Sequence, residues 1–300
     1  MHYCRYPRTL QFEISSNCNA ACLYCQRQTD TAGLPPKNQF LPFELFQNVI
    51  DSEAAKELKI VEFNGTVDDP LMRPDLLDFI DFSIHRGKKI SLHTNASIRT
   101  PEYWARLGKR FSKYRQWNGV VKFNVDGLAD TNHIYRVNTR FDKIMENAQA
   151  FLDAGGIGYW QFIEFEWNSH QIEEARELAK KMGFERFNVR RSKPISKDIV
   201  PTKEISCYYG RQKMYLIKYD GSVLPCCFYS TRHTAYPFFE GAWNNLHNNS
   251  FDDIINHKFY AEELTRQHTS LERCVKHCGK RGTINSRLNE NNQVYDSYEL

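Results

Sequence analysis

The sequence lacks any long apolar segment. No run approaches the roughly eighteen consecutive apolar residues of a membrane-spanning helix, and the N-terminus has no apolar core of the kind found in signal peptides. It also lacks a charge excess of either sign, because 40 basic and 36 acidic residues give a net charge of only +4. A charge this small gives no strong signal for nucleic-acid binding. We therefore expect a cytoplasmic protein with no membrane partner.

Cysteine, in contrast, occurs nine times in the 300 residues. Disulfides are disfavoured in a reducing compartment, so this number indicates reduced thiols that bind metal. The composition, with 41% hydrophobic and 25% charged residues, is that of a globular chain. Its length is sufficient for one barrel-sized domain and a smaller second one.

Three of the cysteines, Cys18, Cys22 and Cys25, follow a strand-like segment at Thr9–Ile14. Three thiolates this close together can bind one metal centre and leave a coordination position open. A structural zinc site needs four ligands, and no fourth Cys or His follows at the usual spacing. The spacing therefore favours an iron–sulfur cluster over a zinc knuckle.

This CxxxCxxC motif, with the aromatic residue Tyr24 before its third cysteine, resembles the signature of the radical S-adenosylmethionine (SAM) enzymes. In that family a 4Fe–4S cluster binds SAM through its open iron, and the reduced cluster cleaves SAM to methionine and a 5′-deoxyadenosyl radical. The resemblance implies both cofactors and an electron donor of the flavodoxin or ferredoxin type. It also implies that Tyr24 lies near SAM.

Strand-like and helix-like segments alternate along the first 200 residues, which indicates a parallel sheet. Six such units predict an α/β fold, a partial (β/α)6 TIM-like barrel, with its active site at the carboxyl ends of the strands. Asp75 and Ser169 are expected N-caps and Gly183 a C-cap. The expected strands are Thr9–Ile14, Lys59–Phe63, Lys89–His93, Val120–Val125, Tyr159–Phe165 and Arg186–Val189, and the expected helices are Pro42–Lys56, Asp75–Arg86, Pro101–Phe111, Phe141–Ala154 and Ser169–Met182.

The segment after the second strand resembles the Gly-Gly-Glu-Pro segment of the family, which binds the amino group of SAM. Gly65 and Pro70 match that pattern, while Asp68 or Asp69 takes the place of the glutamate. An ordinary glycine turn with solvated acids is the alternative. The resemblance makes Asn64, Gly65, Thr66 and Asp68 candidate cofactor-binding residues.

Polar residues also follow the next three strands. Thr94 and Asn95 resemble a Thr-Asn-Gly segment suited to hydrogen bonding with ribose or carboxylate, although a helix-capping turn would use the same residues. Asp126 belongs to an Asp-Gly segment, and Arg136 resembles an arginine that pairs with the cofactor carboxylate, with a surface arginine as the alternative. Asn168 matches a position near the cofactor.

Alternation in the fifth strand places Gln161 or Glu164 inside the barrel, where either would serve as a substrate contact or as a satisfied internal polar group. A basic group after the sixth strand would bind an anionic substrate or form a solvated face. This group consists of Arg190, Arg191 and Lys193.

Beyond residue 200 the alternation stops, and a predicted hairpin around Asp220-Gly221 has a cysteine at each end. This region resembles the SPASM and twitch modules that bind auxiliary clusters, but it has too few cysteines for a full SPASM set. The resemblance implies one additional 4Fe–4S cluster bound by Cys207, Cys226, Cys274 and Cys278. Three alternatives remain: Cys227 in place of Cys226, His277 as a ligand, and a Cys4 zinc site.

The expected domains are a radical SAM barrel over 1–200, an auxiliary-cluster module over 201–280 and a polar tail over 281–300. Cys4 is an expected bystander, and because the first strand starts near residue 8, we expect no preceding leader-peptide-binding domain.

The sequence predicts an enzyme that abstracts hydrogen from a peptide or protein residue. A small-molecule or nucleotide substrate, as in molybdenum cofactor biosynthesis, is the alternative. A non-catalytic iron–sulfur electron carrier and a zinc-binding protein are weaker hypotheses from other classes.

Overall fold

The computed structural model describes residues 5–29, 34–113, 119–192, 205, 207–230, 237–264, 274–275, 278 and 295–299. In these segments one sheet runs in the order β8-β7-β1-β2-β3-β4-β5-β6-β9. The strands are β1 (Thr9–Phe12), β2 (Ile60–Phe63), β3 (Lys89–Thr94), β4 (Val120–Asn124), β5 (Ile157–Glu164), β6 (Arg186–Arg191), β7 (Met214–Ile217), β8 (Val223–Leu224) and β9 (Tyr295–Glu299).

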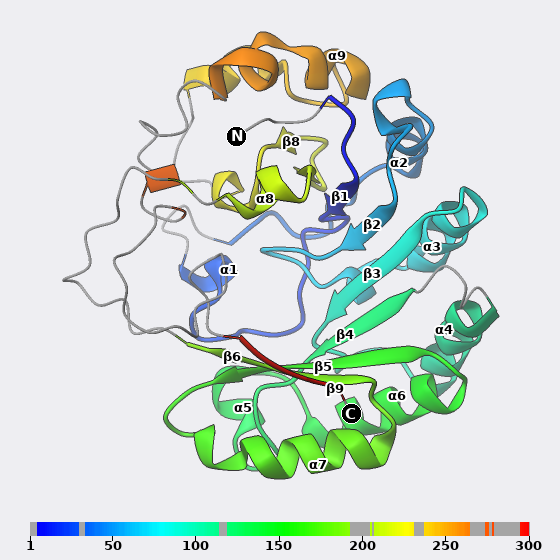
Figure 1. Cartoon of the computed structure of the whole chain (residues 1–300), viewed down its shortest axis with the longest axis vertical. Helices are drawn as coiled ribbons and strands as arrows, with labels where there is room; N and C mark the ends of the chain where they lie inside the picture. Colours follow the sequence, from blue (N-terminus) through cyan, green and yellow to red (C-terminus); the bar gives the residue numbers. More distant parts are fainter. Residues whose placement is uncertain are drawn as a thin grey trace.

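The six strands predicted from the sequence are all present, and β1 to β6 lie in chain order with each neighbouring pair parallel. β1 also pairs with β7, and β6 also pairs with β9. β1 and β6 therefore do not pair with each other, and the barrel stays open between these two ends of the sheet. Figure 1 shows this curved sheet with α2, α3, α4, α6 and α7 along its outer face. The predicted partial TIM-like barrel is confirmed.

The outer face of the sheet carries the hydrophobic core. Apolar side chains alternate along each strand, for example Leu10 and Phe12 in β1, and pack against the helices. Phe46 and Phe79, on two neighbouring helices, pack with their ring centroids 4.6 Å apart and their planes tilted by 46°. The helices are α1 (Gln26–Thr29), α2 (Phe43–Ile50), α3 (Leu76–His85), α4 (Pro101–Lys113), α5 (Asn132–Tyr135), α6 (Phe141–Asp153), α7 (Ile172–Met182), α8 (Tyr208–Arg211) and α9 (Phe251–Asn256).

The inner face of the same sheet is polar, which differs from barrels filled by branched apolar side chains. In register across the strands, Gln11 lies beside Glu62, His93 beside Lys122, and Gln161 beside Asn188. Polar groups of this kind do not pack into a dry core, because each would lose its hydration. A cavity of about 270 Å³ remains in the barrel.

The predicted hairpin at the start of the cysteine-rich region is confirmed as β7 and β8, with Gly221 in the turn at φ 82°. β7 also pairs in parallel with β1, so this region extends the barrel sheet. A second small core at the hairpin packs Tyr209, Leu216 and Cys226 together. The expected domain boundary at residues 200–201 falls outside the described residues, as does His277.

Within the expected polar tail over 281–300, residues 295–299 form β9 and pair antiparallel with β6. The unpaired backbone groups at the β6 edge attract a further strand even where the sequence is polar. Gly183 is the predicted C-cap, at φ 90°. Asp75 occupies the N-cap position but pairs its carboxylate with Arg73, and Ser169 begins a 3₁₀ turn ahead of α7.

No helix among the described residues is both long and apolar enough to cross a membrane.

Candidate functional site

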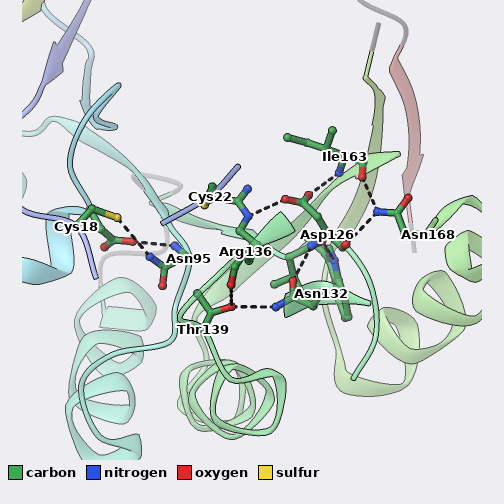
Figure 2. Close-up of polar contacts among 12 residues, drawn as sticks. Cys18, Cys22, Asn95, Asp126, Asn132, Arg136, Thr139, Ile163 and Asn168 are labelled. Atoms are coloured by element: carbon green, nitrogen blue, oxygen red, sulfur yellow. Dashed lines mark hydrogen bonds and ion pairs between the residues drawn. The ribbon is translucent and has the colours of Figure 1, made fainter. Parts of the chain in front are cut away.

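The three N-terminal cysteines lie on the loop after β1, and each sulfur contacts a loop that follows a different strand. Asn95 Nδ2, after β3, lies 3.9 Å from Cys18 Sγ, and Arg136 Nη1, after β4, lies 3.8 Å from Cys22 Sγ (Figure 2). Cys25 Sγ lies 3.8 Å from the Thr66 carbonyl, after β2. The barrel therefore brings the cysteine motif and three predicted cofactor-binding residues to one end of the sheet.

Burial raises the pKa of the Cys18 thiol, and the nearby Asp69 carboxylate raises it further. Burial also raises the pKa of Cys22, although the Arg136 guanidinium opposes this effect. Within the described residues, no group of three or more His, Cys, Asp or Glu side chains could hold a metal ion as it stands. A cationic iron centre would stabilise the thiolate forms of these cysteines, which burial disfavours. A site whose donors are all sulfur atoms suits iron.

Two adjacent carboxylates after β2 have different surroundings. Asp69 accepts hydrogen bonds from the Thr94 hydroxyl and from the backbone N–H groups of Leu71 and Asn95. Asp68 accepts one from Ser15 N–H at 3.1 Å, while its buried Oδ1 has no hydrogen-bond partner. Of the two candidates for the missing glutamate, Asp68 is therefore the one with a free acceptor, and Asp69 has a structural role.

Gly65 is required for the position of Asp68. A Cβ at residue 65 would lie 1.4 Å from Asp68 Oδ1, so only glycine leaves this oxygen its place. Next to it, Thr66 donates its backbone N–H to Glu13 Oε1 at 2.7 Å. Glu13 Oε2, like Asp68 Oδ1, is buried without a partner. Two unpaired acidic oxygens in one region suit a cationic group such as an amine.

We expect Asp68→Asn to stabilise the protein at alkaline pH. Burial first, and then the charges of Glu13 and Asp69, hold the pKa of Asp68 well above its ordinary value. A carboxyl whose folded pKa is raised stabilises the fold at acid pH and loses this contribution as the pH rises through the folded pKa. In urea unfolding at pH 8, Asp68→Asn should gain about 1–2 kcal/mol over wild type, with a smaller gain at pH 5.

The exposed carboxylate Asp142 supplies the control, because Asp142→Asn removes a charge that is paired with Arg140 at the surface. Its stability should follow that of the wild type at both pH values. An Asp68→Asn variant less stable than wild type at pH 8 would show that the carboxylate is stabilising there.

Asp126 and Arg136 form a buried ion pair at the ends of β4 and α5. Arg136 Nε lies 2.6 Å from Asp126 Oδ2, and Ile163 N–H donates to Asp126 Oδ1 at 2.6 Å (Figure 2). Asn168 donates to the backbone oxygens of Asp126 and Ile163, each at 2.9 Å, and accepts from Phe165 N–H. All of these contacts of Asn168 are with backbone, so it positions the loop rather than presenting free polar atoms.

Tyr24 has 66% of its surface exposed beside the cysteine loop. Its ring lies 6.4 Å from Tyr135 and 6.3 Å from Phe165, and Phe165 stacks on Trp167 at 4.6 Å. The aromatic residue of the motif therefore begins a row of rings, a surface suited to stacking with a planar group.

The barrel cavity lies directly beside these loops and includes Asn64 and Arg136 in its lining. Gln161 and Arg190 also line it, in agreement with the predicted inward position of Gln161, whereas Glu164 pairs with Arg191 at 2.9 Å. Lys193 falls outside the described residues.

Glu62 lies next to His93, one of the residues that line the cavity. Burial disfavours ionisation of Glu62, but His93, Lys122 and Asn64 together lower its pKa to about 2. A carboxylate that stays charged therefore lies behind the lining residues His93 and Asn64.

Two residues of the site had no motif to reveal them. Asn19 donates its side-chain N–H to Ser97 at 2.7 Å and accepts from Asn95 at 3.0 Å, which ties the cysteine loop to the loop after β3. Buried Arg27 donates to the carbonyls of Ser16 and Val67, at 2.6 and 2.9 Å. In the sequence, the signal for a role in holding the cysteine loop is position alone: Asn19 lies within the cysteine motif, and Arg27 follows just after it.

The cysteines of the C-terminal region form a second group. Burial raises the pKa of Cys226, and charge on Cys227, Cys207 and Cys274 raises it further. A hydrogen bond with Cys207 and burial raise the pKa of Cys278, and charge on Cys226 and Cys274 adds to this effect. The four predicted ligands therefore lie within electrostatic reach of one another, and so does Cys227. Burial likewise raises the pKa of Cys227, to about 11, but its main neighbours are Tyr209, Glu13 and Arg190.

Family models agree with this arrangement. The model described as the radical SAM superfamily matches residues 12–163, and the SPASM model, described as an iron–sulfur cluster-binding domain, matches residues 207–279. The first match implies a 4Fe–4S cluster and SAM as cofactors, and the second implies further iron–sulfur clusters.

Two curated proteins are similar to this chain. The AdoMet-dependent heme synthase of Methanosarcina barkeri is 25% identical over 187 residues, which cover 61% of this chain and 50% of that protein. The tungsten-containing aldehyde ferredoxin oxidoreductase cofactor-modifying protein of Pyrococcus furiosus is 23% identical over 286 residues, which cover 82% of this chain and 77% of that protein. The chain thus spans about half the length of the heme synthase.

Among solved structures, Streptococcus suis SuiB bound to S-adenosylmethionine superposes with a TM-score of 0.66 at 15% identity, covering 89% of this chain and 68% of SuiB. SuiB bound to its precursor peptide SuiA gives a TM-score of 0.63 at 16% identity, and the match covers 86% of this chain and 67% of SuiB. These likenesses concern the fold. Since the superfamily model covers residues 12–163, just over half of the chain, this protein belongs to the radical SAM superfamily.

Proposed function

We propose that this protein is a radical SAM enzyme that modifies a peptide or protein residue. The observation that carries the proposal is the convergence of Cys18, Cys22 and Cys25 on three loops at the carboxyl end of the barrel. In this proposal the three thiols bind the 4Fe–4S cluster, which would supply the electron that cleaves SAM when bound.

The remaining loop residues would bind and orient SAM. Asp68 Oδ1, unpaired and buried, suits the amino group, with Asn64, Gly65 and Thr66 shaping that loop. Arg136 suits the carboxylate, held in place by Asp126. Asn95 lies beside Cys18, Thr94 precedes it and is held by Asp69, and Tyr24 offers a ring for stacking. Asn168 acts indirectly, by holding Asp126 and Ile163.

The barrel cavity is the proposed substrate site. Its wall carries the amide side chains of Asn64, Asn124, Gln161 and Asn188, which pair with peptide N–H and C=O groups equally well. A peptide substrate is also supported by the similarity of the fold to that of SuiB, which is bound to a precursor peptide in one structure. We further propose that Cys207, Cys226, Cys274 and Cys278 bind one auxiliary 4Fe–4S cluster, and that a flavodoxin or ferredoxin in the cytoplasm supplies electrons.

Anaerobic reconstitution tests the proposal directly. The protein should bind about eight iron atoms per chain, turn brown, and with dithionite convert SAM to methionine and 5′-deoxyadenosine. A colourless zinc protein, or an iron protein that leaves SAM intact, would contradict it. Deuterated peptides and small molecules should then be compared: transfer of deuterium into 5′-deoxyadenosine from a peptide alone supports the peptide assignment, and transfer from a small molecule alone contradicts it.

A further inference from the structure

The barrel cavity has arginines in its wall, and none of the described residues that line it carries a carboxylate. Arg136 and Arg190 belong to the lining, whose other side chains are amides, an imidazole and apolar groups. Arg136 is already paired, because its Nε lies 2.6 Å from Asp126 Oδ2. The side chain of Arg190 makes no hydrogen bond or ion pair with any described residue. Its guanidinium is therefore available to an anionic ligand.

The register of the strands places Gln161 close to this arginine. In the parallel pair of β5 and β6, Gln161 lies opposite Asn188, and Ile163 lies opposite Arg190. Residues two apart on a strand share one face, so all four side chains lie on the same face of the sheet. All four also line the cavity, which identifies this face as the inner one. Gln161 and Arg190 are diagonal neighbours in this block.

Gln161 carries a second donor without a partner. Its Nε2 is buried and makes no hydrogen bond with the described residues. Burial without an acceptor costs the amide its hydration, and nearly all such groups in folded proteins are paired. An acceptor atom of a ligand in the cavity would supply the missing hydrogen bond.

The chemistry of the two donors defines the ligand that suits them. The guanidinium of Arg190 is a charged fork of N–H groups, and Gln161 Nε2 adds neutral N–H groups beside it. A ligand that satisfies both needs negative charge and several acceptor lone pairs on a small group. A carboxylate has these properties, and it pairs with arginine in a bidentate geometry.

The acidic side chains that contact the cavity lining are already engaged. Both oxygens of Asp126 are bound, one to Arg136 and the other to the backbone N–H of Ile163. Glu62 Oε2 lies 3.4 Å from His93 Nε2. Neither carboxylate is free to neutralise Arg190, so the ligand would have to bring its own.

We propose that Arg190 and Gln161 bind a carboxylate of the substrate, so that the substrate peptide carries an acidic residue held in the barrel cavity. This inference rests on the proposed function and names the chemical class of the residue that the cavity receives. Arg136, in the same lining, lies 3.8 Å from Cys22 Sγ, so the cavity that holds the acidic residue extends to the first cluster site.

Ligand-observed NMR titration of the reconstituted full-length protein with SAM, without a reductant, tests this inference. The two probes are N-acetyl-glutamate-N-methylamide and N-acetyl-glutamine-N-methylamide, which differ in charge but hardly in shape. The glutamate probe should bind at least about tenfold more tightly, because only its carboxylate forms charge-assisted hydrogen bonds with the guanidinium. Equal dissociation constants, or no binding of the glutamate probe, overturn the inference.

Arg190→Gln should weaken the binding of the glutamate probe at least about tenfold and make the two probes equal. Arg191→Gln is the matched control, since Arg191 is the next residue of β6 and its Nε lies 2.9 Å from Glu164 Oε2. This control should keep the wild-type preference. Circular dichroism and iron content check the fold of both variants, and the wild-type comparison of probes needs neither. Loss of the preference in both folded variants, or in neither, contradicts the role of Arg190.

A free carboxylic acid carries the same chemical group, and pentanoate separates this source from a peptide. Pentanoate should bind at least about fivefold more weakly than the glutamate probe, because it lacks the peptide groups that the amides of the wall can pair with. Equal or tighter binding of pentanoate overturns the peptide source. The proposed function fails by a different result: if dithionite and SAM yield no 5′-deoxyadenosine, the radical activity is overturned, whatever the probes show.

Discussion

Cys22→Ala is expected to abolish the reductive cleavage of SAM, with the rate of 5′-deoxyadenosine formation lowered at least about 1000-fold. Cys22 is one of only three thiols on the loop after β1, so the remaining two cannot hold a cluster and leave a defined open iron. The variant should also lose the iron of the first site and retain that of the auxiliary site. Iron analysis and chromatography of the SAM products measure both effects.

Cys18→Ala and Cys25→Ala should behave in the same way, since each thiol occupies an equivalent place in the motif. Cys4→Ala is the control, because Cys4 lies outside both cysteine groups in the sequence. It should retain wild-type iron and activity. Full SAM cleavage by Cys22→Ala would disprove the proposed cluster site, and equal losses in Cys4→Ala would point to general damage.

Arg136→Ala should destabilise the fold by about 3 kcal/mol, because it leaves Asp126 without its cationic partner. Asp126 is 0% exposed, and burial already raises its pKa despite the Arg136 charge. Removing Arg136 raises this pKa further, so the stability of the variant should fall as the pH rises from 5 to 8. Urea unfolding at several pH values, under anaerobic conditions without iron, measures the effect.

The exposed Arg140–Asp142 pair provides the control, because Arg140→Ala breaks a surface ion pair of the same type and should leave stability unchanged. Adding Asp126→Asn to Arg136→Ala should restore part of the loss, since no charge then remains buried. If the double variant is no more stable than Arg136→Ala, the destabilisation comes from lost packing of the arginine rather than from the buried charge.

The structure settled several choices that local patterns left open. The sequence left open whether Asp68 or Asp69 takes the place of the family's glutamate. Only the folded loop shows that Thr94 and Asn95 donate hydrogen bonds to Asp69, while one oxygen of Asp68 has no partner. These partners are about 25 residues away in the chain, beyond the reach of any motif. The same holds for Glu13, whose contact with Ser230 joins β1 to the C-terminal region.

The sequence by itself determined the metal chemistry and the order of the elements, because three thiols at fixed spacing and the alternation of strands and helices are local properties of the chain. It also showed that β1 to β6 run parallel, since each pair is joined through a helix. Tertiary structure alone decided that the inner face of the barrel is a polar cavity and that β9 pairs with β6. Those properties depend on which distant side chains share a space, and a buried group takes its charge, its partners and its reactivity from that space.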